Sequence, residues 1–179
     1  NLLRLASRAY FDTALGEAPR LDAGALAGAS EGLIALTGGM AGPLDAAFRA
    51  GRPELALNRL KRLKETFGED RLYVEIQRHG LPEEGRIETA LLDLAGRHGL
   101  GIVATNEPFF AKPDDYDAHD ALLAIAEGRL VSDDRRRRLT PTHAFKTRAE
   151  MAEIFRDLPD ALQASVETAM RCAVRARTR

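Results

Sequence analysis

Short apolar runs alternate with amphipathic segments through the first part of this sequence. Gly32–Thr37 and Gly101–Thr105 are almost continuously apolar, which is typical of strands covered on both faces. Arg71–Gln77 alternates apolar with polar residues, as a strand with one buried face does. Between these runs, residues 53–67 and 82–98 carry apolar side chains at helical spacing. Strands that alternate with helices predict an α/β fold with a parallel sheet and covering helices.

The chain changes character after Asp114. From there the sequence predicts helices without further strands, and the polar stretch 128–142 shows no clear period. Thr147 and Glu150 form the pattern of a capping box at a helix start. We therefore divide the chain into residues 1–112, with strands and helices, and residues 113–179, a helical tail. The further helices are expected at 2–13, 21–26, 43–50, 116–127, 147–158 and from 159 onward.

Composition excludes several classes of protein. Apolar residues make up 45% of the chain, charged residues 30%, and the net charge is -1, so no global field favours a phosphate backbone. No run approaches the length of a membrane span, and no signal peptide precedes the first helix, so a cytoplasmic location without membrane contact is expected. The single cysteine, Cys172, lies in an apolar helical pattern and is expected to be a buried structural thiol.

Several stretches in a fixed order resemble one protein family. The stretches are 1–5, 7–9, 31–39, 73–80, 103–106, 117–120, 150–151 and 155–161. Together they are similar to the alpha subunits of bacterial DNA polymerase III, over the later part of the N-terminal PHP (polymerase and histidinol phosphatase) domain. The chain starts at Asn1 within a helical pattern, so we expect it to be an excised piece.

The resemblance implies a fold and a function. PHP domains are distorted barrels of parallel strands with outer helices, so residues 1–112 are expected to be the later part of such a barrel. Residues 113–179 would lead toward the polymerase core. The parent would be a DNA-directed DNA polymerase that uses Mg²⁺ and binds DNA and other holoenzyme subunits, including the proofreading exonuclease subunit. The aspartates that hold this Mg²⁺ are absent here, so the segment is expected to act as a scaffold without a cofactor.

Two residues at the end of the second predicted strand are candidate metal ligands. Glu75 points away from the apolar face of its strand, and His79 lies just past the strand end. PHP domains that keep their metal cluster hold Zn²⁺ or Mn²⁺ through such residues at the C-terminal ends of barrel strands. The structural alternative is a carboxylate bonded to an arginine and an exposed loop histidine.

A third candidate ligand follows the last predicted strand. Active relatives carry Asp-x-His after the asparagine that corresponds to Asn106, whereas this chain has Glu107 and Phe109 at those positions. Phenylalanine offers no lone pair, and the extra methylene of Glu107 displaces its oxygens. The resemblance therefore implies a degenerate metal site. The opening His-x-His strand of the family is also absent from this sequence.

Four consecutive arginines, Arg135, Arg136, Arg137 and Arg138, form a candidate contact surface for DNA phosphates or an acidic partner. The structural alternative, which we favour, is a solvated loop that Asp133 and Asp134 partly neutralise. No aromatic residues are interleaved for base stacking.

Three functions fit the sequence. The leading interpretation is a scaffold and interaction segment of the replicative polymerase. The alternatives are a metal-dependent PHP phosphoesterase of the proofreading type and the error-prone polymerase paralogue, whose PHP region reads similarly.

Overall fold

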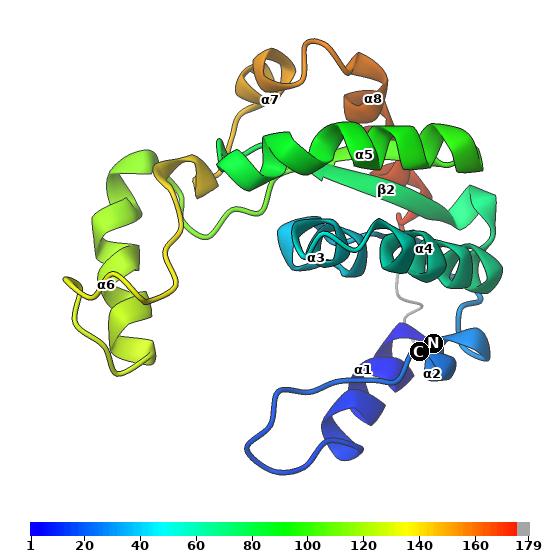
Figure 1. The fold of residues 1–179 in the computed structure, drawn as a ribbon, viewed down its shortest axis with the longest axis horizontal. Helices are drawn as coiled ribbons and strands as arrows, with labels where there is room; N and C mark the ends of the chain where they lie inside the picture. Colours follow the sequence, from blue (N-terminus) through cyan, green and yellow to red (C-terminus); the bar gives the residue numbers. More distant parts are fainter. Residues whose placement is uncertain (175–179) are drawn as a thin grey trace. The chain divides into compact units, whose positions relative to one another are not determined.

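The computed structural model describes residues 1–174 (Figure 1). These residues form two compact units, each made of two stretches of the chain. The first unit contains Asn1–Val74 and Ala90–Gly101, and the second contains Glu75–Thr89 and the chain from Ile102 onward. One three-stranded sheet has the order β1-β2-β3.

The first unit is mainly helical. Helix α4 is its longest complete helix and begins at Pro53, where the missing N–H of proline costs no helical hydrogen bond. It ends before Gly68, which has a φ of 75° that glycine adopts without strain. The elements of this unit are α1 (Leu2–Phe11), α2 (Gly24–Ala27), β1 (Ala35–Leu36), η1 (Gly39–Ala41), α3 (Pro43–Arg49), α4 (Pro53–Phe67), η2 (Glu69–Arg71), the first half of β2 (Leu72–Gln77) and the second half of α5 (Pro82–His98).

Helices α3 and α4 pack against each other and provide much of the core of the first unit (Figure 1). Leu44 of α3 and Leu60 of α4 are completely buried, and Phe67 is 5% exposed. The apolar stripe predicted for α4 is therefore confirmed, with Leu57 and Leu63 half-buried at its margins. Burial of these large side chains is the main stabilising contribution in this unit.

Strand β1 is much shorter than the predicted strand 32–37. It pairs in parallel with β2, Ala35 opposite Leu72 and Leu36 opposite Tyr73. Before it, the Leu33 N–H donates to the Ser30 carbonyl at 3.1 Å, so the chain still turns there. The predicted burial on both faces is wrong, since Leu36 is 38% exposed.

The tight turn after β1 requires a glycine. A Cβ atom at Gly42 would lie 2.0 Å from the carbonyl oxygen of Thr37. Any side chain there would force the backbone apart, so Gly42 fixes how the chain passes from the strand into α3.

The second unit surrounds the C-terminal halves of two strands. Among its elements, α6 ends at Ala126, and the polar stretch that follows has little regular structure, as predicted. The elements are the end of β2, the start of α5, β3 (Gly101–Thr105), η3 (Pro113–Asp115), α6 (Tyr116–Ala126), η4 (Pro141–His143), α7 (Arg148–Ile154) and α8 (Pro159–Arg171).

Helix α8 is attached to the end of β3 within this unit. The Ser165 hydroxyl of α8 donates to the carbonyl of Ala104, and Phe155, between α7 and α8, is 1% exposed. The predicted capping box at the start of α7 is confirmed, because Thr147 and Glu150 exchange hydrogen bonds between side chain and backbone. These contacts hold the last two helices next to the strand ends.

Helix positions were predicted better than burial near the C-terminus. Cys172 is exposed, so the prediction of a buried thiol is wrong. The chain there has just left α8, and Met170 of that helix is also 72% exposed.

The boundary proposed at residues 112 and 113 is not the division between the two compact units, and as a domain boundary it stays a prediction. Within residues 1–174, no helix combines the length with the apolar composition that a bilayer span requires.

The burial of Leu60 predicts a large loss of stability on truncation. Leu60→Ala should lower the free energy of unfolding by about 2–5 kcal/mol, because it leaves a cavity between α3 and α4. Lys61→Ala, at an exposed neighbouring position, is the control and should change this value by less than about 0.5 kcal/mol. Urea denaturation followed by circular dichroism measures both. Equal midpoints for the two variants would contradict the packing described.

Candidate functional site

Glu75 lies near the end of β2 in a small hydrogen-bond network. It is 7% exposed, and the Thr105 hydroxyl of β3 donates to its Oε1 at 2.5 Å. The Gln77 amide donates to the same Oε1 at 3.1 Å and to the Thr105 hydroxyl at 3.2 Å. The sequence correctly placed Glu75 away from the apolar side chains of its strand. Its carboxylate links neighbouring strands through side-chain hydrogen bonds.

His79 is buried and oriented by a carboxylate. It is 2% exposed, and its Nδ1 lies 2.8 Å from Oε1 of Glu84 in the first turn of α5. The other carboxylate oxygen accepts from the backbone N–H groups of His79 at 2.7 Å and Leu81 at 3.1 Å. The expected alternative of an exposed loop histidine is therefore wrong, since the turn after β2 folds the ring back onto α5.

The same contacts determine the ionisation of Glu84. Burial acts to raise the pKa of this carboxyl, but the hydrogen bonds from the His79 ring and from the His79 and Leu81 backbone outweigh burial and hold the pKa below its ordinary value. Glu84 is thus a carboxylate at neutral pH, and it favours a His79 tautomer with the proton on Nδ1.

His143 stacks on His79, which the sequence did not predict. The ring centroids are 3.9 Å apart and the planes differ by 6°. Burial, followed by the neighbouring charge of His79, lowers the pKa of His143 from 6.5 to about 4, so its ring is neutral at neutral pH. The Thr140 N–H donates to its Nδ1 at 3.1 Å. The sequence places His143 just past the polar stretch 128–142, where no local pattern points to its distant partner.

The loop that carries His143 is attached to the end of β2. The hydroxyls of Thr140 and Thr142 both donate to the carbonyl of His79, the first at 3.3 Å. Lys146 donates to Oδ1 of Asn106 at 3.2 Å, and burial lowers the pKa of this lysine. The His79 carbonyl and the Asn106 side chain thus help to hold this loop in place.

Glu107 and Phe109 reach the same region from the end of β3. The backbone N–H of Glu107 lies 3.4 Å from Nε2 of His79, while the Glu107 side chain is exposed. The Phe109 ring lies 6.1 Å from the His143 ring and 5.8 Å from the His119 ring, centroid to centroid. Phe109 therefore contributes aromatic packing at the position that, by the resemblance, corresponds to a histidine in active relatives.

The three candidate ligands are only partly brought together. His79 meets the backbone of Glu107, and Glu75 is held by Thr105 on the neighbouring strand. Across residues 1–174, no group of three or more His, Cys, Asp or Glu side chains has a geometry that could hold a metal ion.

Arg78, next to His79, connects three parts of the second unit. Its guanidinium binds Glu88 of α5 at 2.5 and 3.0 Å, and Asp157 after α7 at 2.6 and 2.9 Å. It also donates to the Ile154 carbonyl at 2.7 Å and lies 4.8 Å from the centre of the Phe155 ring. Its hydrogen bonds lower the pKa of Asp157 to about 2. Sequence analysis did not predict this role of Arg78.

The arginine run is not a uniform exposed patch. Arg136 is buried, and its guanidinium forms a bidentate ion pair with Asp120 of α6. One of the two N–O distances, from Nη1 to Oδ1, is 2.5 Å. Hydrogen bonding within this pair lowers the pKa of Asp120 and raises that of Arg136. The burial of Arg136 corrects the sequence expectation that all four arginines lie in a solvated loop. The contact of this run with DNA or a partner stays a prediction. Arg135, Arg137 and Arg138 are exposed.

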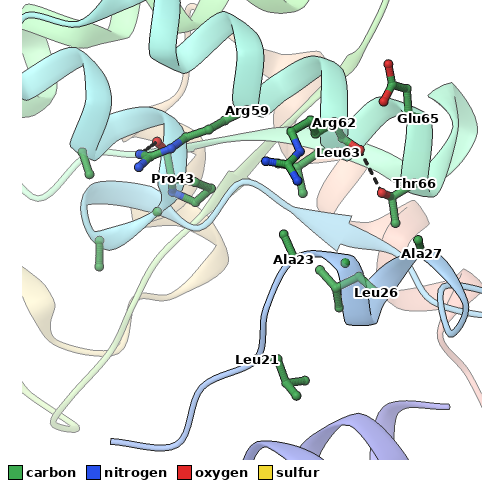
Figure 2. Close-up of a pocket in the computed structure, with 14 residues that line it drawn as sticks. Leu21, Ala23, Leu26, Ala27, Pro43, Arg59, Arg62, Leu63, Glu65 and Thr66 are labelled. Atoms are coloured by element: carbon green, nitrogen blue, oxygen red, sulfur yellow. Dashed lines mark hydrogen bonds between the residues drawn. The ribbon is translucent and has the colours of Figure 1, made fainter.

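A separate pocket of about 860 Å³ lies in the first unit, between the α2 segment and α4 (Figure 2). Leu26 and Ala27 line one side, and Arg62 and Leu63 of α4 line the other. The Arg59 guanidinium at its edge donates to the Pro43 carbonyl at 2.7 Å. The pocket is mainly apolar, and sequence analysis did not predict it. It contains none of the candidate ligands.

The lowered pKa of His143 predicts a loss of stability in mild acid. An unfolded histidine takes up a proton near pH 6.5 but the folded one only near pH 4, so stability falls as the pH drops between these values. We expect a loss of about 1–3 kcal/mol, because water screens part of the charge. His143→Phe keeps a ring but cannot titrate. Its free energy of unfolding, measured by urea denaturation, should depend less steeply on pH in this range. An unchanged slope would contradict the prediction.

Comparison with known proteins gives consistent relatives. A family model described as "PHP domain" matches residues 1–79. The DNA polymerase III subunit alpha of Caulobacter vibrioides is 48% identical over 173 residues, which is 97% of this chain and 15% of that protein. The subunits of the same name from Thermus aquaticus and Escherichia coli are 40% and 36% identical, over 90% and 99% of this chain and 13% and 15% of theirs.

The chain thus spans about 15% of the length of these relatives. The similarity runs through both compact units and continues well beyond the residues that the PHP model matches. Over nearly its whole length, this chain is similar to one segment of bacterial DNA polymerase III alpha subunits.

Proposed function

We propose that this chain is a scaffold and interaction segment of a replicative DNA polymerase III alpha subunit. In the whole protein, template-directed DNA synthesis would rely on Mg²⁺-binding residues outside this segment. Residues 1–112 would be the later part of a PHP-type barrel, and residues 113–179 would lead toward the polymerase core. The partners would be DNA and other holoenzyme subunits, including the proofreading exonuclease subunit.

One observation carries the scaffold role. The polar side chains at the ends of β2 and β3, where barrel enzymes place their chemistry, are used in contacts inside the second unit. Glu84 holds His79, Thr105 and Gln77 hold Glu75, and the His79 carbonyl accepts from two threonines. Few lone pairs in this cluster remain for a metal ion.

The donor set supports a degenerate metal site. Phe109 offers no ligand atom and packs against His119 and His143. His143 stacks face to face on His79, an arrangement in which the two rings do not point their nitrogen atoms at one ion. This set does not fit a cluster of Zn²⁺ or Mn²⁺ ions.

A metal-dependent phosphoesterase is the second candidate. It is favoured by the pair of Glu84 and His79, because metal-binding histidines are commonly oriented by a carboxylate on the other ring nitrogen. The other ring nitrogen of His79, Nε2, faces the Glu107 N–H at 3.4 Å. This contact is long, so a metal ion could take its place, which also favours the second candidate. The error-prone paralogue is a less favoured alternative, because the relatives compared carry the name of the replicative subunit.

Metal analysis distinguishes the scaffold from the phosphoesterase. After incubation with Zn²⁺ or Mn²⁺ and dialysis, the chain should retain well under one ion per molecule by mass spectrometry. His79→Phe should retain the same amount of metal, because the scaffold proposal gives the His79 ring no part in metal binding. Hydrolysis of bis-p-nitrophenyl phosphate should stay at the background level. Stoichiometric metal that is lost in His79→Phe would overturn the proposal.

A further inference from the structure

The pocket beside α4 has the size of a small-molecule site (Figure 2). Its volume of about 860 Å³ lies within the range of about 300–1,000 Å³ that is typical of such sites. All of the residues that line it belong to the first unit, so the pocket is formed within one compact body.

Small residues keep this space open. The glycines and alanines of the lining are Ala23, Gly24, Ala27, Ala41, Gly42 and Ala46. At Gly42 a side chain is excluded, because its Cβ atom would lie 2.0 Å from the Thr37 carbonyl oxygen. The wall next to the start of α3 therefore stays without a side chain, and the space beside α4 remains free for a ligand.

Three leucines give the pocket an aliphatic surface. Leu21 and Leu26 lie on the side of the α2 segment and Leu63 on the side of α4, and all three are half-buried (Figure 2). An aliphatic ligand would remove the rest of their surface from water, which is favourable. None of the lining residues is aromatic, so the described part of the pocket offers no ring on which a nucleobase could stack.

Two arginines of α4 add positive charge to this aliphatic surface. Arg59 and Arg62 are three residues apart, so they lie on one side of the helix. Arg59 is held in place by the Pro43 carbonyl, to which it donates at 2.7 Å. The Arg62 guanidinium forms no hydrogen bond or ion pair with any residue in 1–174, and Glu65 is the single acidic residue of the lining. Arg62 is therefore available for an anionic group of a ligand.

We infer that this pocket binds a small aliphatic carboxylate. The aliphatic chain lies against Leu21, Leu26 and Leu63, and the carboxylate pairs with the Arg62 guanidinium in a charge-assisted hydrogen bond. The inference does not rest on the proposed scaffold role, because the pocket contains no residue of the His79 region.

The two features of the pocket together select this class of ligand. A nucleotide would use the arginines but would leave the leucines uncovered, and a neutral alkyl compound would cover the leucines but would leave Arg62 without a partner. Only a ligand with an aliphatic chain and a negative charge at its end uses both features.

The test is isothermal titration calorimetry on the 179-residue chain with octanoate, octanol and dATP, each below any concentration at which it forms micelles. Octanol has the same chain as octanoate without the charge. We expect octanoate to bind, and octanol and dATP to bind at least about ten-fold more weakly. In ¹H–¹⁵N NMR spectra, octanoate should shift the amide signals of Leu26, Ala27 and Leu63, which line the pocket.

Substitutions separate the roles of charge and space. Arg62→Gln should weaken octanoate binding about ten-fold, to the level of octanol, and should leave octanol binding unchanged. Ala27→Phe fills part of the pocket and should weaken both ligands. Lys61→Gln is the matched control, because Lys61 is an exposed cation of the same helix that does not line the pocket, and it should change neither. Arg59 is kept, because it holds the start of α3.

Four results would overturn the inference. They are no binding of octanoate, octanol binding as tight as that of octanoate, octanoate binding that Arg62→Gln leaves unchanged, and tighter binding of dATP than of octanoate. Circular dichroism shows whether each variant is folded, and octanol binding by Arg62→Gln shows that its pocket is intact. The metal content of the chain is measured separately, so this inference and the scaffold proposal fail independently.

Discussion

Two consecutive residues at the end of β2 hold the second unit together. Arg78 joins α5 to the segment between α7 and α8 through Glu88, Asp157 and the Ile154 carbonyl. The His79 ring pairs with Glu84 in the first turn of α5. The His79 carbonyl accepts a hydrogen bond from Thr142, in the loop that carries His143. A charged group and an imidazole that are largely removed from water are costly unless they are fully paired, and here the pairing comes from elements that are distant in sequence. The arrangement of the unit depends on these pairs.

The same pairs shape the functional account. In an α/β barrel enzyme, the ends of the strands expose polar side chains to substrate, and those side chains cost stability in exchange for activity. In this chain the corresponding groups are satisfied internally, with Glu75 bound by Thr105 and His79 bound by Glu84. A region built in this way contributes rigidity.

Local patterns in the sequence predicted the regular elements well. Strands β2 and β3 and the long helices α4 and α5 follow from apolar periodicity, and the capping box at Thr147 from its residue types. The resemblance to polymerase III alpha subunits also held, because it rested on an ordered set of motifs. The sequence could not predict long-range pairing. His143 lies 64 positions from its stacking partner His79, and Arg136 finds Asp120 across a helix and a turn, so neither partnership follows from local spacing.

The stability of His79→Asn in metal-free buffer tests the central claim most directly. If His79 serves cohesion, its loss leaves the buried Glu84 carboxylate without a ring partner and should lower the free energy of unfolding by about 1–3 kcal/mol. If His79 were kept for metal chemistry, its replacement would leave stability unchanged or raise it. Urea denaturation of the two chains side by side gives the answer. A lower midpoint for the variant is predicted, and an equal or higher midpoint would contradict the account.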